Sequence, residues 1–284
     1  MSIFPTHVSS TTQINHNEKP GEIFFGLKSH VDITWDENET YNQIMPLEEV
    51  RVLSFNISYW VTWGILGQLT NYYLKDRGVN INIEIINKPD FCNAYLDENE
   101  ISIPFPKKQN IKELYNNFIR IFLKLDAPAF EAFNITLQAT MESEIKGPLG
   151  FITFLSPANK IVNITLLPDY YGNVGYLLPE GNIIETPPLV EKQLPIKLYN
   201  FGNGKSLIES EIISAPSDFI VYLDPENLIL DVLENKTIYL KVIAPSNFSG
   251  IETITSMFTP SFLGRPDLKG QPEIITFYCN YNPS

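Results

Sequence analysis

Residues 53–63 read LSFNISYWVTW, and this stretch decides the fold class. Apolar side chains occupy every second position, at Leu53, Phe55, Ile57, Tyr59, Val61 and Trp63. The positions between them are mostly polar, at Ser54, Asn56, Ser58 and Thr62. Because successive side chains of a β-strand point to opposite faces of its sheet, this period of two predicts a strand with one buried and one solvent-facing side.

The same alternation recurs along the chain, with Pro, Gly and Asn between the repeats. It is found at residues 81–85, 119–125, 133–139, 162–166 and 238–242. Half-buried strands separated by turn residues, with few helical stretches, are typical of an all-β protein built from sandwiches. One segment differs, because Asn110 is followed three residues later by Glu113. This capping-box pattern predicts a short helix near residues 111–117.

The length of 284 residues is enough for two ordinary domains with proper cores. We place the boundary in the Gly- and Asn-containing stretch LLPDYYGNVGY, near residues 170–172. The sequence therefore predicts two tandem β-sandwich domains, at residues 21–170 and 171–284. We expect residues 1–20 to be a flexible N-terminal arm.

The net charge of -13 and the pI of about 4.7 limit the classes of partner. An acidic chain repels phosphate backbones and anionic lipid surfaces, so we expect no nucleic acid and no direct membrane contact. The N-terminus has no basic start followed by an apolar run, which is the pattern of a signal peptide. We expect any export signal or membrane anchor to lie outside this chain.

Residues 199–206 read YNFGNGKS, and Gly204-Lys205-Ser206 is how a phosphate-binding loop ends. Such a loop needs a glycine five residues before Gly204, where this chain has Tyr199, and it needs a helix after the serine. The following residues, LIESEIISAPSDF, read as a strand and a turn. We therefore expect a tight hairpin turn whose Asn and Gly residues tolerate positive φ, and no bound cofactor.

The second half of the chain contains LPIKLYNFGNGKSLIESEI (residues 194–212) and APSDFIVYLDPENLILDVLENKTIYLKVIAPSNFSGIETITSMF (residues 215–258). These stretches resemble immunoglobulin-like sandwich domains of prokaryotic, especially archaeal, surface proteins. Such domains include CARDB-type adhesion modules and the sandwich module appended to alpha-galactosidases. Asn200, Gly202 and Asn203 match the family's first turn, residues 233–237 its second turn, and Ala244-Pro245 with Gly250 its last step. Asp218-Phe219 departs from the usual Gly-Trp. The first half is similar, less closely, to a domain that precedes such modules. The resemblance implies an exported structural or adhesive role.

The sequon Asn-x-Ser/Thr occurs six times, at Asn38, Asn56, Asn134, Asn163, Asn235 and Asn247. On an alternating strand the pattern can simply be two outward polar residues, yet an outward position is also what an N-linked glycan needs. Both interpretations stay open, the glycan only for an exported protein. Cys92 and Cys279 either form one disulfide or remain two buried thiols, and two cysteines do not decide between these states.

Candidate reactive groups are few. The three histidines, His7, His16 and His30, lie in the first 30 residues, and no Cys/His spacing fits zinc. The acidic runs at residues 36–39 and 97–100 lack the glycine and alternating Asp of a calcium loop, so we expect solvated turns and no metal. We predict no catalytic residues and no enzyme activity. Trp60 falls on the polar face of its strand, where it either packs between sheets or contacts a glycan or partner.

We therefore expect a non-catalytic extracellular segment of a cell-surface or secreted protein, acting as a structural or adhesive spacer and contact module. Its expected partners are other cell-surface proteins or glycans. Three alternatives stay open: a carbohydrate-binding module, a glycosidase or glycosidase-associated module, and a subunit of a surface layer or filament.

Overall fold

The computed structural model describes residues 26–282, except for residues 66, 75, 77, 142–144 and 147–152. The arm predicted at residues 1–20, with His7 and His16, lies outside the described residues. Two compact units are present. The described part of unit 1 runs up to Ile44 and includes Glu49–Phe122 and Ala132–Leu167. Unit 2 contains Met45–Glu48, Leu123–Glu131 and the residues from Pro168 onward. The domain boundary at residues 170–171 stays a prediction.

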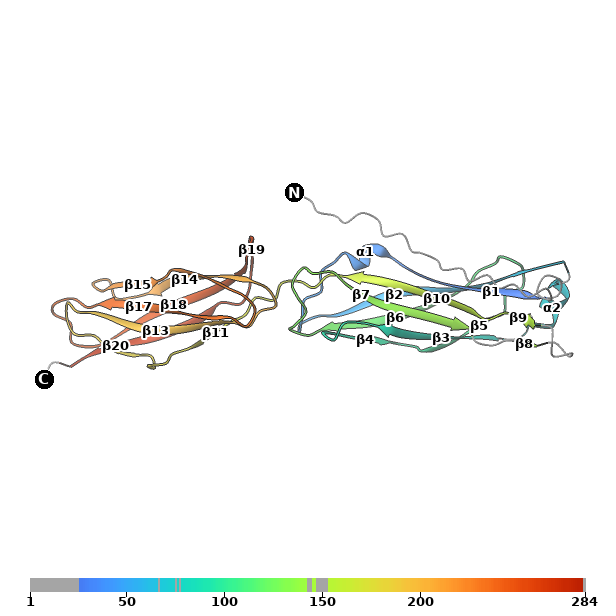
Figure 1. Cartoon of the computed structure of the whole chain (residues 1–284). Helices are drawn as coiled ribbons and strands as arrows, with labels where there is room; N and C mark the ends of the chain where they lie inside the picture. The colour runs from blue at the N-terminus through green and yellow to red at the C-terminus, as the bar shows by residue number, and fades with distance from the viewer. Residues whose placement is uncertain are drawn as a thin grey trace. The chain divides into compact units, whose positions relative to one another are not determined.

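Unit 1 is built almost entirely from strands (Figure 1). Its elements are β1 (Leu27–Trp35), α1 (Glu37–Thr40), β2 (Val50–Trp63), α2 (Gly67–Leu74), β3 (Gly78–Asn87), β4 (Cys92–Leu96), β5 (Glu100–Pro104), β6 (Glu113–Leu123), β7 (Phe133–Met141), β8 (Ile145–Lys146), β9 (Thr153–Leu155) and β10 (Ala158–Leu166). One sheet has the strand order β4-β6-β2-β1-β9-β8, and the other has the order β10-β7-β3-β5.

The core of unit 1 forms where the two sheets face each other. β2 contributes Leu53, Phe55, Ile57, Tyr59 and Val61, each no more than 2% exposed. The alternating row predicted from the sequence is therefore the buried face of a strand. Burial of several large side chains, at about 1.5–3 kcal/mol each, is what holds such a sheet against its partner.

The helix predicted at residues 111–117 is wrong. These residues lead into β6, which pairs antiparallel with β2 from Tyr59↔Glu113 to Val50↔Phe122. A two-turn helix is marginal in water, whereas the strand gains ladder hydrogen bonds and buries Ile119 and Ile121. The Asn before the segment adopts a φ of 60°, which belongs to a turn and not to a helix cap.

Unit 2 is also a two-sheet sandwich (Figure 1). Its strands are β11 (Val174–Leu177), β12 (Ile183–Glu185), β13 (Glu191–Asn200), β14 (Ser206–Ser214), β15 (Ile220–Asp224), β16 (Asn227–Leu230), β17 (Asn235–Ile243), β18 (Gly250–Phe262), β19 (Arg265–Lys269) and β20 (Glu273–Tyr281). The sheet orders are β11-β13-β17-β15 and β12-β20-β18-β14-β16, and β19 pairs with β18. Ile196, Leu240, Ile254, Phe258 and Phe277 lie at its centre with no exposed surface. The predicted all-β sandwich fold is confirmed.

Candidate functional site

The Gly-Lys-Ser segment is part of a structural crossing between the two sheets of unit 2. β13 ends at Asn200 and β14 begins at Ser206, as expected for strands, but the two strands belong to different sheets. The predicted hairpin is therefore wrong. Lys205 pairs with Asp231, Nζ to Oδ1 2.9 Å.

Two buried asparagines hold this crossing together. Asn200 Nδ2 donates to the carbonyls of Gly204 and Leu230, and its Oδ1 accepts from the Gly202 amide. Asn203 Oδ1 accepts from the Tyr171 amide at 2.7 Å. Gly202 is needed for a close approach and not for positive φ, because a Cβ there would lie 2.6 Å from a backbone oxygen. These side chains replace the ladder bonds that are lost when the chain leaves a sheet.

All six sequon asparagines are exposed. They are Asn38 in α1, Asn56 in β2, Asn134 in β7, Asn163 in β10, Asn235 in β17 and Asn247 in the turn after β17. Asn134 and Asn163 take part in reciprocal cross-strand bonds. Thr165 donates to Asn134 at 2.7 Å, and Thr136 donates to Asn163 at 2.8 Å. The outward placement that a glycan needs is present, and glycosylation itself stays a prediction.

The disulfide left open by the sequence is not formed. Cys92 in β4 and Cys279 in β20 are both free and fully buried. Burial raises the pKa of the Cys92 thiol to about 11, and it also raises the pKa of Cys279. Each thiol acts as a small apolar core residue.

Trp60 lies on the outer face of its sheet, as the alternation predicts, but its ring has two close neighbours. His30, its direct partner on β1, stacks on it with ring centroids 5.1 Å apart and an interplanar angle of 9°. Lys112, just before β6, places Nζ 4.6 Å from the ring centroid. These neighbours already occupy part of the ring surface on which a sugar would stack. Burial, and secondly a nearby lysine, lower the pKa of His30.

A groove opens on the side of unit 1 where the chain changes from one sheet to the other. β4 is the end strand of one sheet, and the next strand, β5, is the end strand of the opposite sheet. β5 pairs with β3 only along Gly78–Asn82. Beyond that point, in the part of the chain that the structure describes, no strand pairs with this side of β3. The change of sheet therefore leaves a notch between β3 and β4.

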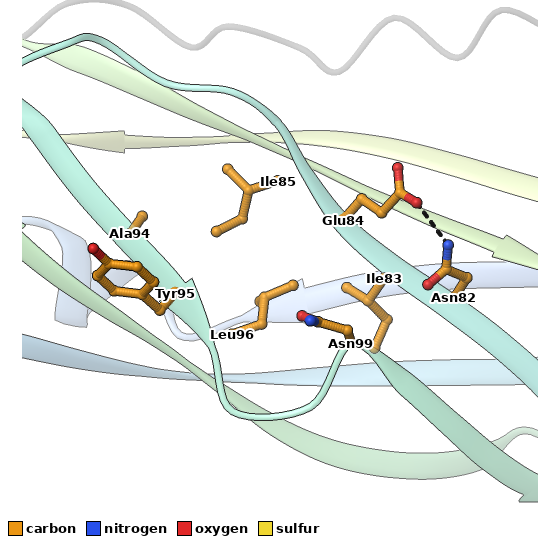
Figure 2. Close-up of a pocket in the computed structure, with 8 residues that line it drawn as sticks. All are labelled: Asn82, Ile83, Glu84, Ile85, Ala94, Tyr95, Leu96 and Asn99. Atoms are coloured by element: carbon orange, nitrogen blue, oxygen red, sulfur yellow. Dashed lines mark hydrogen bonds between the residues drawn. The ribbon is translucent and has the colours of Figure 1, made fainter.

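The notch forms a groove of about 540 Å³, which is within the size range of ligand sites (Figure 2). Its lining residues are Asn82, Ile83, Glu84 and Ile85 from β3, Ala94, Tyr95 and Leu96 from β4, and Asn99 from the connection to β5. Asn82 Nδ2 donates to Glu84 Oε1 at 2.7 Å, which holds this carboxylate at the rim. Tyr95 is 65% exposed.

The charges next to the groove are mainly acidic. Arg120 binds Asp97 through two hydrogen bonds of 2.7 and 2.9 Å, and this holds the pKa of that carboxyl below its usual range. Glu98 accepts a hydrogen bond from the Tyr115 hydroxyl, which raises the pKa of the tyrosine. Within the described part of the chain, Glu84 pairs with the Asn82 side chain and with no cation, and it is the one charged residue that lines the groove. An occupant of the groove would therefore meet a carboxylate.

A second candidate surface is the outer face of β18 and β20 in unit 2. The outward positions pair as Ile251↔Asn280, Thr253↔Tyr278, Thr255↔Thr276 and Met257↔Ile274. None of these eight residues is charged, although the chain carries a net charge of -13. Glu185 and Glu211 lie at the borders, on β12 and β14. We call the eight residues the uncharged face.

Sequence reasoning missed both surfaces. The uncharged face has a signal in the sequence, because β18 and β20 place only Ile, Thr, Met, Tyr and Asn at their outward positions. The notch has no signal in the sequence, because the alternation of apolar and polar residues shows which residues face a core but not which sheet a strand joins.

Among the described residues, no group of three His, Cys, Asp or Glu side chains lies close enough to hold a metal ion. Within the same residues, no helix is both long and apolar enough to cross a membrane.

No family model and no curated protein matches the chain. It is similar to the endo-fucoidan hydrolase MfFcnA4 of glycoside hydrolase family 107, with 10% identity, 95% of this chain and 31% of that chain covered, and a TM-score of 0.26. It is similar to the D00-D0 domain of intimin, with 8% identity, 89% and 100% covered, and a TM-score of 0.29. It is also similar to the sialic acid binding region of a Streptococcus sanguinis SK1 adhesin, with 8% identity, 89% and 77% covered, and a TM-score of 0.28. At these TM-scores, any conclusion about function has to come from the residues themselves.

Proposed function

We propose that this chain is a non-catalytic contact module of a cell-surface or secreted protein. Its sandwiches act as a stiff spacer, and the uncharged face of unit 2 is where it meets a second copy. The observation that carries the proposal is the composition of that face, which exposes Ile251, Ile274 and Tyr278 without a single charge.

Electrostatics favour a copy-to-copy contact through this face. Two chains of net charge -13 repel each other, and the repulsion is smallest where the touching surfaces carry no charge. Ile251 lies at one end of this face and Ile274 at the other, and such an uncharged, partly apolar surface suits a protein contact. A contact of this kind suits a subunit of a surface layer or filament, where many weak contacts act together.

The alternative of a carbohydrate-binding module receives less support. Trp60, the residue that would stack on a sugar, already has His30 and Lys112 against its ring. The uncharged face has one exposed aromatic residue, Tyr278, among side chains that suit a protein contact better than a sugar contact.

Sedimentation velocity over a range of protein concentrations tests the proposal. We expect the wild-type chain to associate reversibly, and to associate more strongly when added salt screens the charge repulsion. Ile274→Glu places a carboxylate in the uncharged face and is expected to abolish association. Ile220→Glu is the matched control, because Ile220 is 59% exposed on the other sheet of unit 2, and Ile274 is 53% exposed. A monomer at every concentration and salt level would rule out the copy-to-copy contact.

A further inference from the structure

We propose that the free edge of β4, in the groove of unit 1, binds an extended peptide segment of a partner protein as an added strand. The peptide has apolar side chains at alternate positions and a basic side chain between them. This inference rests on the proposed function as a contact module, and it names a separate site and the class of its ligand. Four observations carry it.

The first observation is the direction of the backbone groups of β4. The Asp97 amide donates to Phe118 of β6, so residue 97 turns toward β6. The Cys92 amide donates to Pro89, and the Cys92 carbonyl accepts from Lys88 Nζ, so residue 92 turns away from β6. Backbone groups alternate in direction along a strand. The amides and carbonyls of Ala94 and Leu96 therefore point away from β6, to the open side.

The second observation is that the core of unit 1 is incompletely covered at the notch. Ile83 and Ala94 are buried, but the inward-facing Ile85 and Leu96 remain half-buried. β5 covers β3 on the other half of its length and stops at Asn82. One apolar side chain from an added strand would enter the groove between Ile85 and Leu96 and complete this cover (Figure 2).

The third observation is that β4 itself carries none of the usual blocking residues of an edge strand, and Lys88 covers only the Cys92 carbonyl at its start. Natural proteins block free edges with proline, lysine or other charged residues. In unit 1, β5 ends on Pro104 and β10, another end strand, carries Lys160. β4, with the sequence CNAYL, has no proline and no charged residue.

The fourth observation is the charge at the rim, which selects the chemistry of the peptide. Glu84 is the one charged residue among those that line the groove. Lys88, at one end, is engaged with the Cys92 carbonyl, and Arg120 neutralises Asp97. A lysine or arginine of the peptide that lies outward, next to β3, would pair with Glu84.

Amide hydrogen exchange on the full-length, isotope-labelled chain tests the proposal. The probe is an acetylated heptapeptide of alternating lysine and apolar residues, lysine-valine-lysine-isoleucine-lysine-valine-lysine. A control peptide has the same composition with its lysines in one block. We expect the alternating peptide to slow exchange of the Ala94 and Leu96 amides at least about tenfold at saturation, since both become ladder donors. The control peptide is expected to leave them unchanged.

Substitutions at the rim test the charge. Glu84→Lys is expected to weaken binding of the alternating peptide about fivefold to tenfold, and Glu84→Gln less, because each removes or reverses one exposed ion pair. Glu191→Lys on β13, an exposed strand glutamate in the other sheet of unit 2 that also accepts one hydrogen bond from a neutral side chain, is the matched control and is expected to bind like the wild type.

The proposal is overturned if the alternating peptide binds without protecting Ala94 and Leu96, if it fails to bind, or if the block peptide protects them equally. It is also overturned if cellohexaose shifts the Tyr95 resonances and blocks the groove while no peptide binds, since the site would then recognise a sugar. Self-association through the uncharged face is measured separately by sedimentation. A failure at the groove is thereby distinguished from a failure of the copy-to-copy contact.

Discussion

Replacing Asn200 with alanine tests whether side-chain hydrogen bonds hold the crossing between β13 and β14. The Asn200 side chain makes bonds of 2.9 Å to Gly204, 3.1 Å to Leu230 and 2.9 Å from Gly202, and the residue is 1% exposed. Bulk water therefore does not reach these partners in the folded chain. At about 1 kcal/mol of net stability for each bond, the loss of three bonds is expected to cost about 3 kcal/mol. This corresponds to about 150-fold in the folding equilibrium constant.

Urea unfolding of the full chain, followed by far-ultraviolet circular dichroism, measures the change. For an m-value of about 2 kcal/mol/M, the midpoint of the transition that belongs to unit 2 should fall by about 1.5 M. Tryptophan fluorescence provides an internal reference, because Trp35, Trp60 and Trp63 all lie in unit 1. Asn235→Ala is the matched control, since Asn235 is an exposed asparagine of the same unit and its loss should cost less than about 0.5 kcal/mol.

Asn200→Asp separates hydrogen bonding from size. The aspartate has nearly the same shape, but near neutral pH it turns a carboxylate oxygen toward the carbonyls of Gly204 and Leu230. We expect it to destabilise at least as much as alanine near neutral pH. Stability should recover as the pH falls, because the folded site favours the protonated acid, which can donate. The reasoning is refuted if Asn200→Ala unfolds like Asn235→Ala, or if Asn200→Asp is tolerated near neutral pH.

Three further outcomes follow from the packing. Cys92 and Cys279 should react with a soluble disulfide reagent only after denaturation. Because burial raises the pKa of Cys92 from 9.0 to about 11, the stability of the fold should fall as the pH rises between these values, and urea midpoints would show this. Gly202→Ala should cost about 1–3 kcal/mol by the same assay, since its Cβ would meet a backbone oxygen at 2.6 Å. Protonation of His30 should change the fluorescence of the stacked Trp60, with the midpoint of the change at a pH below 6.5, and this change should be absent in His30→Phe. Because the unfolded chain binds this proton more tightly than the folded chain, the contribution of His30 to stability is lost as the pH falls.

The sandwich fold was predictable because the alternation of apolar and polar residues can be read directly from the sequence. Tyr59, for example, stands in an apolar row and is fully buried in the structure. The helix near residue 111 was predicted wrongly because a local capping pattern at Asn110 and Glu113 was weighed against nothing else. In the fold, β6 gains a ladder with β2, and tertiary pairing overrides a local preference worth about 1 kcal/mol. Gly202 was assigned to a positive-φ turn for a similar reason. The close approach of the Tyr171 backbone oxygen, which explains this glycine, cannot be read from the residues next to it in the sequence.

The groove could not have been predicted, and the reason is physical. The buried positions change from even numbers, as at Ala94, to odd numbers, as at Ile101, so the pattern separates two short strands, but it fits equally well whether they join the same sheet or opposite sheets. What differs is the sheet that each half joins, and this depends on which free edge is within reach when the rest of the sandwich has formed. In this chain the change of sheet leaves Ala94 and Leu96 with backbone groups that no strand of the described chain uses. A free edge of this kind favours aggregation unless something pairs with it, and β4 itself contains neither the proline nor the lysine that would block such pairing.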